Sequence, residues 1–223
     1  MSESESSASH APVTHAVAAA SRPLRVVVLA SGTGTLLQAM IDDLGDRVDI
    51  VAVIVDRPCS ALDRAGEAGI PGILVEYNPQ RVSGYDRDVW NQHLLEAIAE
   101  CEPDVIVSAG FMRIIGPAVI ARFPGRIINT HPALLPAFVG ARAVEDALEY
   151  GVSLTGSTVH VVDDGVDTGP ILAQRAVPVQ RGDTVDTLHE RIKTVERALI
   201  VDVLHRTADN GYTIEGRKAW IND

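Results

Sequence analysis

The chain has 223 residues, of which 46% are hydrophobic and 4% aromatic, enough to close one sizeable core. Its formal net charge is −11, of which the first 22 residues supply only −1 (Glu3 and Glu5 against Arg22), so the folded part is acidic and a nucleic-acid partner is not expected. Cys59 and Cys101 show no C-x-x-C spacing, and we find neither an apolar run of about 18 residues nor a secretory segment, which predicts a cytoplasmic protein without a membrane partner.

The first half of the chain repeats a strand and helix pattern. Residues 1–22 are rich in Ser and Ala without a periodic apolar face, so we expect a disordered tail followed by a single domain over 23–223. That domain opens with a continuous apolar run at 25–30, a glycine-containing loop at 31–35 and an amphipathic stretch at 36–44. The pattern recurs, with strands expected at 49–55, 72–76, 104–109 and 126–129 and helices at 61–68 and 85–99.

The second half has a different pattern. A helix near 141–149 precedes two expected strands, 155–162 and 171–179, whose short acidic connection predicts an antiparallel pair. A final helix over 184–204 has Asp183 as its expected N-cap. Together the halves predict an α/β fold, a mostly parallel, doubly wound, Rossmann-like sheet with an antiparallel edge in the C-terminal half. Such sheets bind ligands beyond the carboxyl ends of their strands.

The first loop is a candidate anion site. Gly32 and Gly34 stand where a strand passes into a helix, so backbone N–H groups and the positive helix end can face a phosphate or carboxylate. A dinucleotide fingerprint needs a third glycine where Leu37 stands, although Asp56 has the place of a ribose-binding acid. A tight turn without a ligand also explains this segment.

The segment Asn129-Thr130-His131-Pro132 carries the densest chemical signal. If its strand ends near Asn129, alternation points Asn129 and His131 to the same side, where an amide donor and an imidazole suit acyl chemistry. A turn asparagine and a histidine bound to a backbone carbonyl are the alternative.

The acidic loop at 163–170 supplies a third component. Asp167 near His131 would favour the charged imidazole and hold a water for proton transfer. A solvated turn is one alternative, and a metal site built from Asp163, Asp164, Asp167, His131 and His160 is another. No H-x-x-x-H or EF-hand spacing favours a metal, and no G-x-S-x-G elbow favours a serine hydrolase, so we expect no metal.

Four segments in order give the chain its family resemblance. Ser31 to Gly34, the run A-G-F-M-R-I-I at 109–115, N-x-H-P-x-L-L-P at 129–136 and D-x-G-P at 167–170 resemble the glycinamide ribonucleotide formyltransferases over about 24–205. The resemblance implies the formyltransferase fold and transfer of the formyl group of 10-formyltetrahydrofolate to the amine of 5-phosphoribosylglycinamide in purine biosynthesis. Residues of about 23–125 would form the half that binds the nucleotide phosphate, and those of about 126–205 the catalytic and folate half. A homodimer is one candidate assembly.

The resemblance also implies roles for individual residues. Asn129 matches the oxyanion donor, His131 the acid–base residue and Asp167 the carboxylate that keeps the imidazole charged. The phosphate and ribose of the substrate would be bound by Gly32, Thr33, Gly34, Thr35, Lys193 and Glu196. The folate pocket would be formed by Met112, Arg113, Ile114, Ile115, Asn129, Asp163 and Asp167.

Two segments depart from the family pattern, and three other functions compete with formyl transfer to phosphoribosylglycinamide. The usual S-G-x-G-S-N loop has Thr35 and Leu36 in its last two places, so a side-chain amide contact to phosphate is lost, and the P-K/R-Y-P-G segment has become P-A-F-V-G at 136–140. A formyltransferase of initiator tRNA would add an RNA-binding domain, and a formyltetrahydrofolate hydrolase would add a regulatory one, and neither is expected here. A nucleotide-binding module without turnover would leave the Asn-x-His and Asp segments idle.

Overall fold

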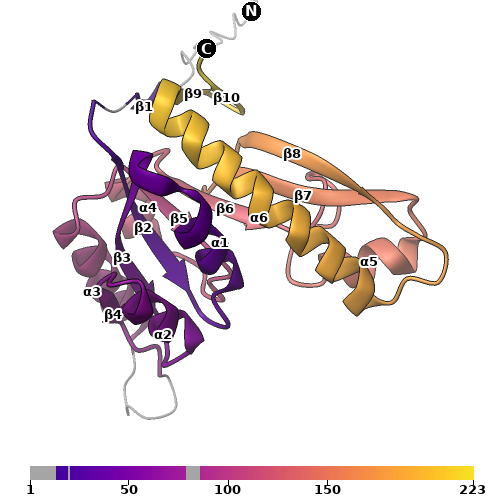
Figure 1. Cartoon of the computed structure of the whole chain (residues 1–223), viewed down its shortest axis with the longest axis horizontal. Coiled ribbons are helices and arrows are strands. Elements are labelled where there is room, and N and C mark those ends of the chain that lie inside the picture. Colours follow the sequence, from indigo (N-terminus) through magenta and orange to yellow (C-terminus); the bar gives the residue numbers. More distant parts are fainter. Residues whose placement is uncertain (1–13, 20, 79–85) are drawn as a thin grey trace, which may run out of the picture.

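One mixed sheet of ten strands forms the centre of the part of the chain that the structure describes, residues 14–19, 21–78 and 86–223 of a computed structural model. The strand order is β1-β9-β10-β8-β7-β6-β5-β2-β3-β4 (Figure 1). The predicted fold class is confirmed, because the middle strands are parallel and the C-terminal half adds antiparallel strands at one edge.

The parallel part of the sheet has helices on both faces. Its strands are β2 (Leu24–Ala30), β3 (Val48–Val55), β4 (Gly72–Leu74), β5 (Val105–Ser108) and β6 (Ile127–His131). They are linked through α1 (Thr35–Asp43), the short 3-10 helix η1 (Gly45–Arg47), α2 (Ser60–Glu67), α3 (Arg87–Glu100) and α4 (Pro117–Arg122). Val26 and Val28 pack on one face and Val27 and Leu29 on the other, which is why β2 is a continuous apolar run.

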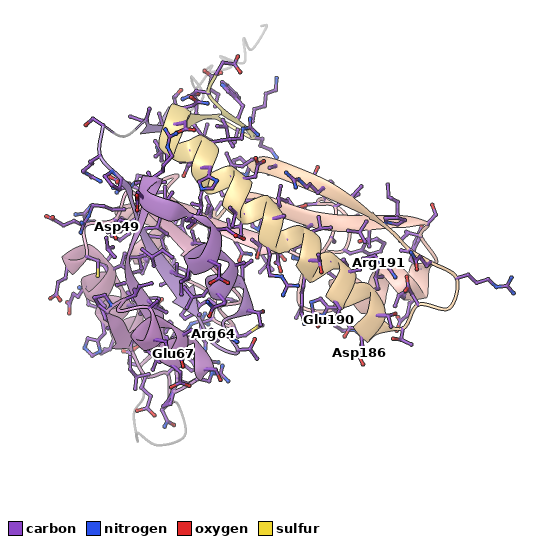
Figure 2. All side chains as sticks on the ribbon, viewed as in Figure 1. Asp49, Arg64, Glu67, Asp186, Glu190 and Arg191 are labelled. Atoms are coloured by element: carbon purple, nitrogen blue, oxygen red, sulfur yellow. The ribbon has the colours of Figure 1, made fainter. Side chains whose placement is uncertain are left out.

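The second half extends the sheet and covers it with one long helix. β7 (Leu154–Val161) is antiparallel to β6 and to β8 (Ile171–Pro178), and α5 (Ala143–Tyr150) precedes them. The 26-residue α6 (Val185–Asn210) crosses the sheet beside α1, with Leu199 and Val203 in the core. Charged side chains of α6 such as Asp186 and Glu190 are exposed (Figure 2).

Two expectations about the chain ends are wrong. The predicted tail includes β1 (Thr14–Ala18), which pairs with β9 (Gly211–Glu215), itself paired with β10 (Lys218–Ile221); residues 1–13 lie outside the described residues. β1 is ordered because Val17 is buried and its backbone completes the edge of β9. The final helix begins one residue later than expected and continues six residues further.

The cap of α6 also differs from the prediction. Thr184, not Asp183, is the N-cap, and its hydroxyl accepts a hydrogen bond from the Thr187 N–H. Asp183 instead pairs with Arg191, with 2.7 Å between Nη2 and Oδ1, and the hydrogen bond from this guanidinium lowers the pKa of Asp183.

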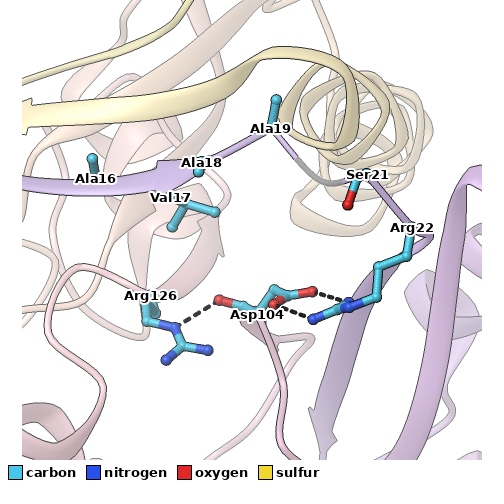
Figure 3. Close-up of a pocket in the computed structure, with 8 residues that line it drawn as sticks. All are labelled: Ala16, Val17, Ala18, Ala19, Ser21, Arg22, Asp104 and Arg126. Carbon is cyan, nitrogen blue, oxygen red and sulfur yellow. Dashed lines mark hydrogen bonds and ion pairs between the residues drawn. The ribbon is translucent and has the colours of Figure 1, made fainter.

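The segment after β1 is attached at the amino ends of the strands. Arg22 forms an ion pair with Asp104, with 2.7 Å between Nη1 and Oδ2, and Arg126 donates to the Asp104 carbonyl (Figure 3). These residues and β1 line a cavity of about 420 Å³. This cavity lies at the opposite end of the strands from the predicted catalytic residues.

Candidate active site

The predicted site residues meet at the carboxyl ends of the strands. A cavity of about 450 Å³ is bounded by the loop after β2, the end of β6, the loop between β7 and β8, and α6. Its lining includes Gly32, Thr33, Gly34, Thr35, Met112, Asn129, His131, Asp167, Lys193 and Glu196. Segments separated by more than a hundred residues in sequence therefore bring their polar side chains to one cavity.

The glycine loop lies against α2 and opens α1. Gly34 has φ of +69°, and a Cβ there would lie 2.9 Å from the Cα atom of Ala61, so both backbone conformation and space require glycine. α1 has no side-chain cap and no acidic residue in its first turn. The positive end of α1 is therefore available to an anion.

His131 is the most deeply placed of the three predicted catalytic residues. It ends β6 opposite Thr158 of β7 and is 4% exposed. Its Nδ1 lies 3.2 Å from Oδ2 of Asp167, and its Nε2 lies 2.7 Å from the carbonyl oxygen of Phe138. Because both neighbours only accept hydrogen bonds, the doubly protonated imidazolium satisfies both contacts.

Asp167 is fixed by several donors. Its Oδ2 accepts from the Gly140 N–H at 2.8 Å, which ties the acidic loop to the 136–140 segment. His160 lowers the pKa of Asp167, and the Gly140 N–H and the charge of His131 lower it further, against the opposing effect of burial. Asp167 therefore stays ionised beside His131.

His160 is a site residue whose place the sequence did not reveal. It lies directly opposite Asn129 in the β6–β7 register, is 2% exposed, and has Nε2 3.3 Å from Nδ2 of Asn129 and 3.6 Å from Oδ1 of Asp167. The sequence suggested His160 only as a metal ligand. Among the described residues, no group of three or more His, Cys, Asp or Glu residues is arranged to hold a metal ion.

The predicted folate wall divides into exposed and buried members. Met112 and Ile114 are 70% and 62% exposed, whereas Ile115 is buried. The site also has a smaller cavity, of about 160 Å³, whose lining includes Arg113, Ile114, Ile115, Asp163 and His160. Asn129 and Asp167 line both this cavity and the larger one of about 450 Å³. The carboxylate of Asp163 accepts from Thr168 and from the Gly165 N–H, so Asp163 holds the shape of its own loop.

Arg113 is engaged with a buried acid. Its Nε lies 2.6 Å from Oδ2 of Asp56, and its guanidinium lies 4.0 Å from the ring centre of Tyr77. Burial raises the pKa of Asp56, but hydrogen bonds from Ser31, Arg57 and Arg113 outweigh it and lower that pKa overall. Asp56 has no exposed surface, so it cannot contact a ribose, and this removes the dinucleotide alternative.

The cavity face of α6 carries charged residues one turn apart. Lys193 pairs with Glu190, with 2.8 Å between Nζ and Oε1. Burial raises the pKa of Glu196, against the effects of a Thr130 hydrogen bond and the charges of Arg197 and Lys193. His189 also lines the cavity, and sequence inspection missed it because helical spacing alone does not show which face meets the glycine loop.

Comparison with known proteins agrees with this geometry. The sequence pattern described as formyl transferase matches residues 24–204. The chain belongs to the formyl transferase family. It is 54% identical over 202 residues to the phosphoribosylglycinamide formyltransferase of Mycobacterium tuberculosis, covering 89% of this chain and 92% of that relative. It is 36% identical to the Escherichia coli protein of the same name, and the match covers 89% of this chain and 94% of that relative.

Solved structures of similar proteins have the same fold. Glycinamide ribonucleotide transformylase 1 from Symbiobacterium toebii superposes with a TM-score of 0.85 at 38% identity, over 92% of this chain and 96% of that one. A formyltetrahydrofolate deformylase from Pseudomonas syringae superposes with a TM-score of 0.83 at 26% identity, over 91% and 67%. Across the described residues, no helix is long and apolar enough to cross a membrane.

Proposed function

We propose that this protein transfers the formyl group of 10-formyltetrahydrofolate to the amine of 5-phosphoribosylglycinamide, giving formylglycinamide ribonucleotide and tetrahydrofolate in the cytoplasm. The observation that carries the proposal is the convergence of Asn129, His131 and Asp167 on a cavity that the glycine loop also lines. The relatives named phosphoribosylglycinamide formyltransferase support the same substrate.

In this proposal each substrate is assigned to one of the two cavities. The phosphate binds at the glycine loop, where N–H groups and the positive end of α1 attract an anion, and Lys193 and Glu196 contact the ribose side. The folate ring packs on Met112 and Ile114, whose exposed apolar surface its binding would bury. Because Asn129 and Asp167 line both cavities, the formyl carbon and the amine meet beside them.

The chemistry is acyl transfer through a tetrahedral intermediate. The neutral amine attacks the formyl carbon, a new C–N bond forms, and the carbonyl electrons move to oxygen, where the Asn129 amide and the His131 imidazolium stabilise the negative charge. The intermediate collapses as the bond from carbon to the folate N10 breaks. The amine loses one proton and N10 gains one, and His131 with Asp167 and a water carries it.

The 136–140 segment must shift during this reaction. Nε2 of His131 is bound to the Phe138 carbonyl, so it can donate to the formyl oxygen only after that contact is exchanged. Asp167, held on Nδ1, keeps the ring oriented during the exchange.

A spectroscopic assay for folate product tests the proposal directly. Tetrahydrofolate should form from 10-formyltetrahydrofolate only when phosphoribosylglycinamide is present, with formylglycinamide ribonucleotide in equal amount. Equal rates without the amine would establish a hydrolase, the activity in the name of the Pseudomonas syringae neighbour, and overturn the proposal.

A further inference from the structure

The glycine loop is held from behind by α2. The carbonyl of Gly32 accepts a hydrogen bond from the Ala61 N–H at 3.2 Å. The carbonyl of Thr33 accepts one from Nε of Arg64 at 2.8 Å, and Nη1 of the same guanidinium donates to Oε1 of Gln38 on α1, also at 2.8 Å. Arg64, labelled on α2 in Figure 2, thus links the loop to α1 and α2.

These contacts decide where the N–H groups of the loop point. In a planar trans peptide the C=O and the following N–H point in opposite directions. The Gly32 carbonyl shares its peptide with the Thr33 N–H, and the Thr33 carbonyl shares its peptide with the Gly34 N–H. Because residues of α2 donate hydrogen bonds to both carbonyls, both N–H groups point away from α2.

The opposite side of the loop is the substrate cavity. Residues 32–36 line that cavity, whereas Ala61 and Arg64 do not. Within the described part of the chain, neither the Thr33 nor the Gly34 N–H donates a hydrogen bond. Two adjacent unpaired N–H groups aimed into one cavity form a concave anion site.

Gly34 makes these hydrogen bonds from α2 necessary. Glycine places little restriction on rotation of the peptide that precedes it, so the Thr33–Gly34 peptide can turn over unless something holds it. Leu36 supplies no polar side chain, so the anion depends more on backbone donors. A turned peptide would present a carbonyl oxygen to the phosphate in place of an N–H.

We propose that Arg64 is a positioning residue for substrate binding: through the Thr33 carbonyl it fixes the Gly34 N–H toward the phosphate. The inference rests on the proposed function, which places the phosphate at this loop. Arg64 does not touch the substrate, so it acts on binding of the ribonucleotide and leaves the chemical step unchanged.

Arg64→Met and a matched control, Arg197→Met, test this role. Arg197 lies in the same groove beside α1 and bonds Thr194 instead of the loop, so both variants remove one positive charge from one region. Arg64→Met should raise KM for phosphoribosylglycinamide about tenfold, with kcat and the folate KM within about twofold of wild type. Arg197→Met should change that KM by no more than about twofold.

Inorganic phosphate provides a readout that does not depend on turnover. Its dissociation constant, measured by calorimetry on the whole protein, should rise in Arg64→Met in parallel with KM and stay near wild type in Arg197→Met. Equal increases in both variants would show that Arg64 acts through its charge alone and overturn the inference, as would an unchanged KM in Arg64→Met.

Arg64→Lys covers the case in which Arg64→Met fails to fold. Lysine keeps the charge but cannot bond Thr33 and Gln38 together in the same geometry, so KM for the ribonucleotide should rise about threefold. An unchanged KM would overturn the positioning role. If wild-type protein itself makes no folate product with the ribonucleotide, the proposed function fails; if it does, an unaffected Arg64 variant defeats only this inference.

Discussion

The side-chain nitrogen of Asn129 lies 3.3 Å from Nε2 of His160. The other ring nitrogen of His160 lies 3.0 Å from the carbonyl of Val161, which can only accept a hydrogen bond. With its proton on Nδ1, the His160 ring donates to Val161, and Nε2 can accept from the Asn129 amide. The amide of Asn129 is therefore oriented, with its second N–H left for the oxyanion.

Replacing His160 should impair turnover more than binding. In His160→Phe the amide loses its fixed partner, and kcat should fall about tenfold, the equivalent of one hydrogen bond, while KM for the ribonucleotide changes little. His160→Gln, which can still accept from Asn129, should recover part of the loss. In an Asn129→Ala background His160→Phe should add little, and full additivity would show that His160 does not act through Asn129.

His131→Ala should lower kcat by at least about 100-fold, because the variant loses both the oxyanion contact and the proton carrier. Affinity for the ribonucleotide, measured by calorimetry, should stay nearly unchanged since the glycine loop is intact. His93→Ala, at an exposed position on α3, is the control and should keep wild-type turnover. Near-normal turnover of His131→Ala would remove the acid–base assignment.

Asp167 should give the folded protein a pH-dependent stability. A carboxyl with a lowered pKa in the folded chain adds stability above its ordinary pKa of 3.8, and this is lost as pH falls through the lower folded value. At pH 7 to 5, Asp167→Asn should melt about 4 °C below wild type, and the gap should close only below pH 3.8. Melting curves at each pH measure this. A difference in melting temperature that already narrows between pH 7 and 5 would show that the pKa of Asp167 is raised, not lowered.

Arg113→Met should destabilise the protein by about 2 kcal/mol, because it leaves the buried carboxylate of Asp56 with only part of its partners. Urea unfolding measures the loss. Adding Asp56→Asn removes the uncompensated charge and should restore about half of it. A double variant no more stable than Arg113→Met would show that Arg113 contributes mainly through packing on Tyr77.

Ile114→Ala should raise KM for the folate about tenfold and leave KM for the ribonucleotide unchanged, because the ring would lose apolar contact with an exposed side chain. Val89→Ala, which shortens another half-exposed aliphatic residue away from both site cavities, is the matched control. Equal effects on both substrates would argue against a folate wall at Ile114.

Local patterns predicted the centre of the fold, and the family resemblance predicted which residues meet at the site. β2 is apolar on both faces, and the carboxyl ends of parallel strands share one edge, so Asn129 and the glycine loop were expected at the same edge of the sheet. Pairings between distant segments were not predictable, because nothing in β1 marks β9 as its partner. The position of His160 opposite Asn129 was not predictable either, because it depends on the register between β6 and β7. The ion pair between Asp56 and Arg113 likewise joins segments that are distant in sequence.

The shared wall between the two cavities has a consequence for inhibitor design. Asn129, Val166 and Asp167 line both, so the cavity proposed for the ribonucleotide adjoins the cavity proposed for the folate. A single compound that joins a phosphate-bearing group to an aromatic ring by a short tether across this wall would bind its second half at high effective concentration, and its affinity would far exceed that of either half.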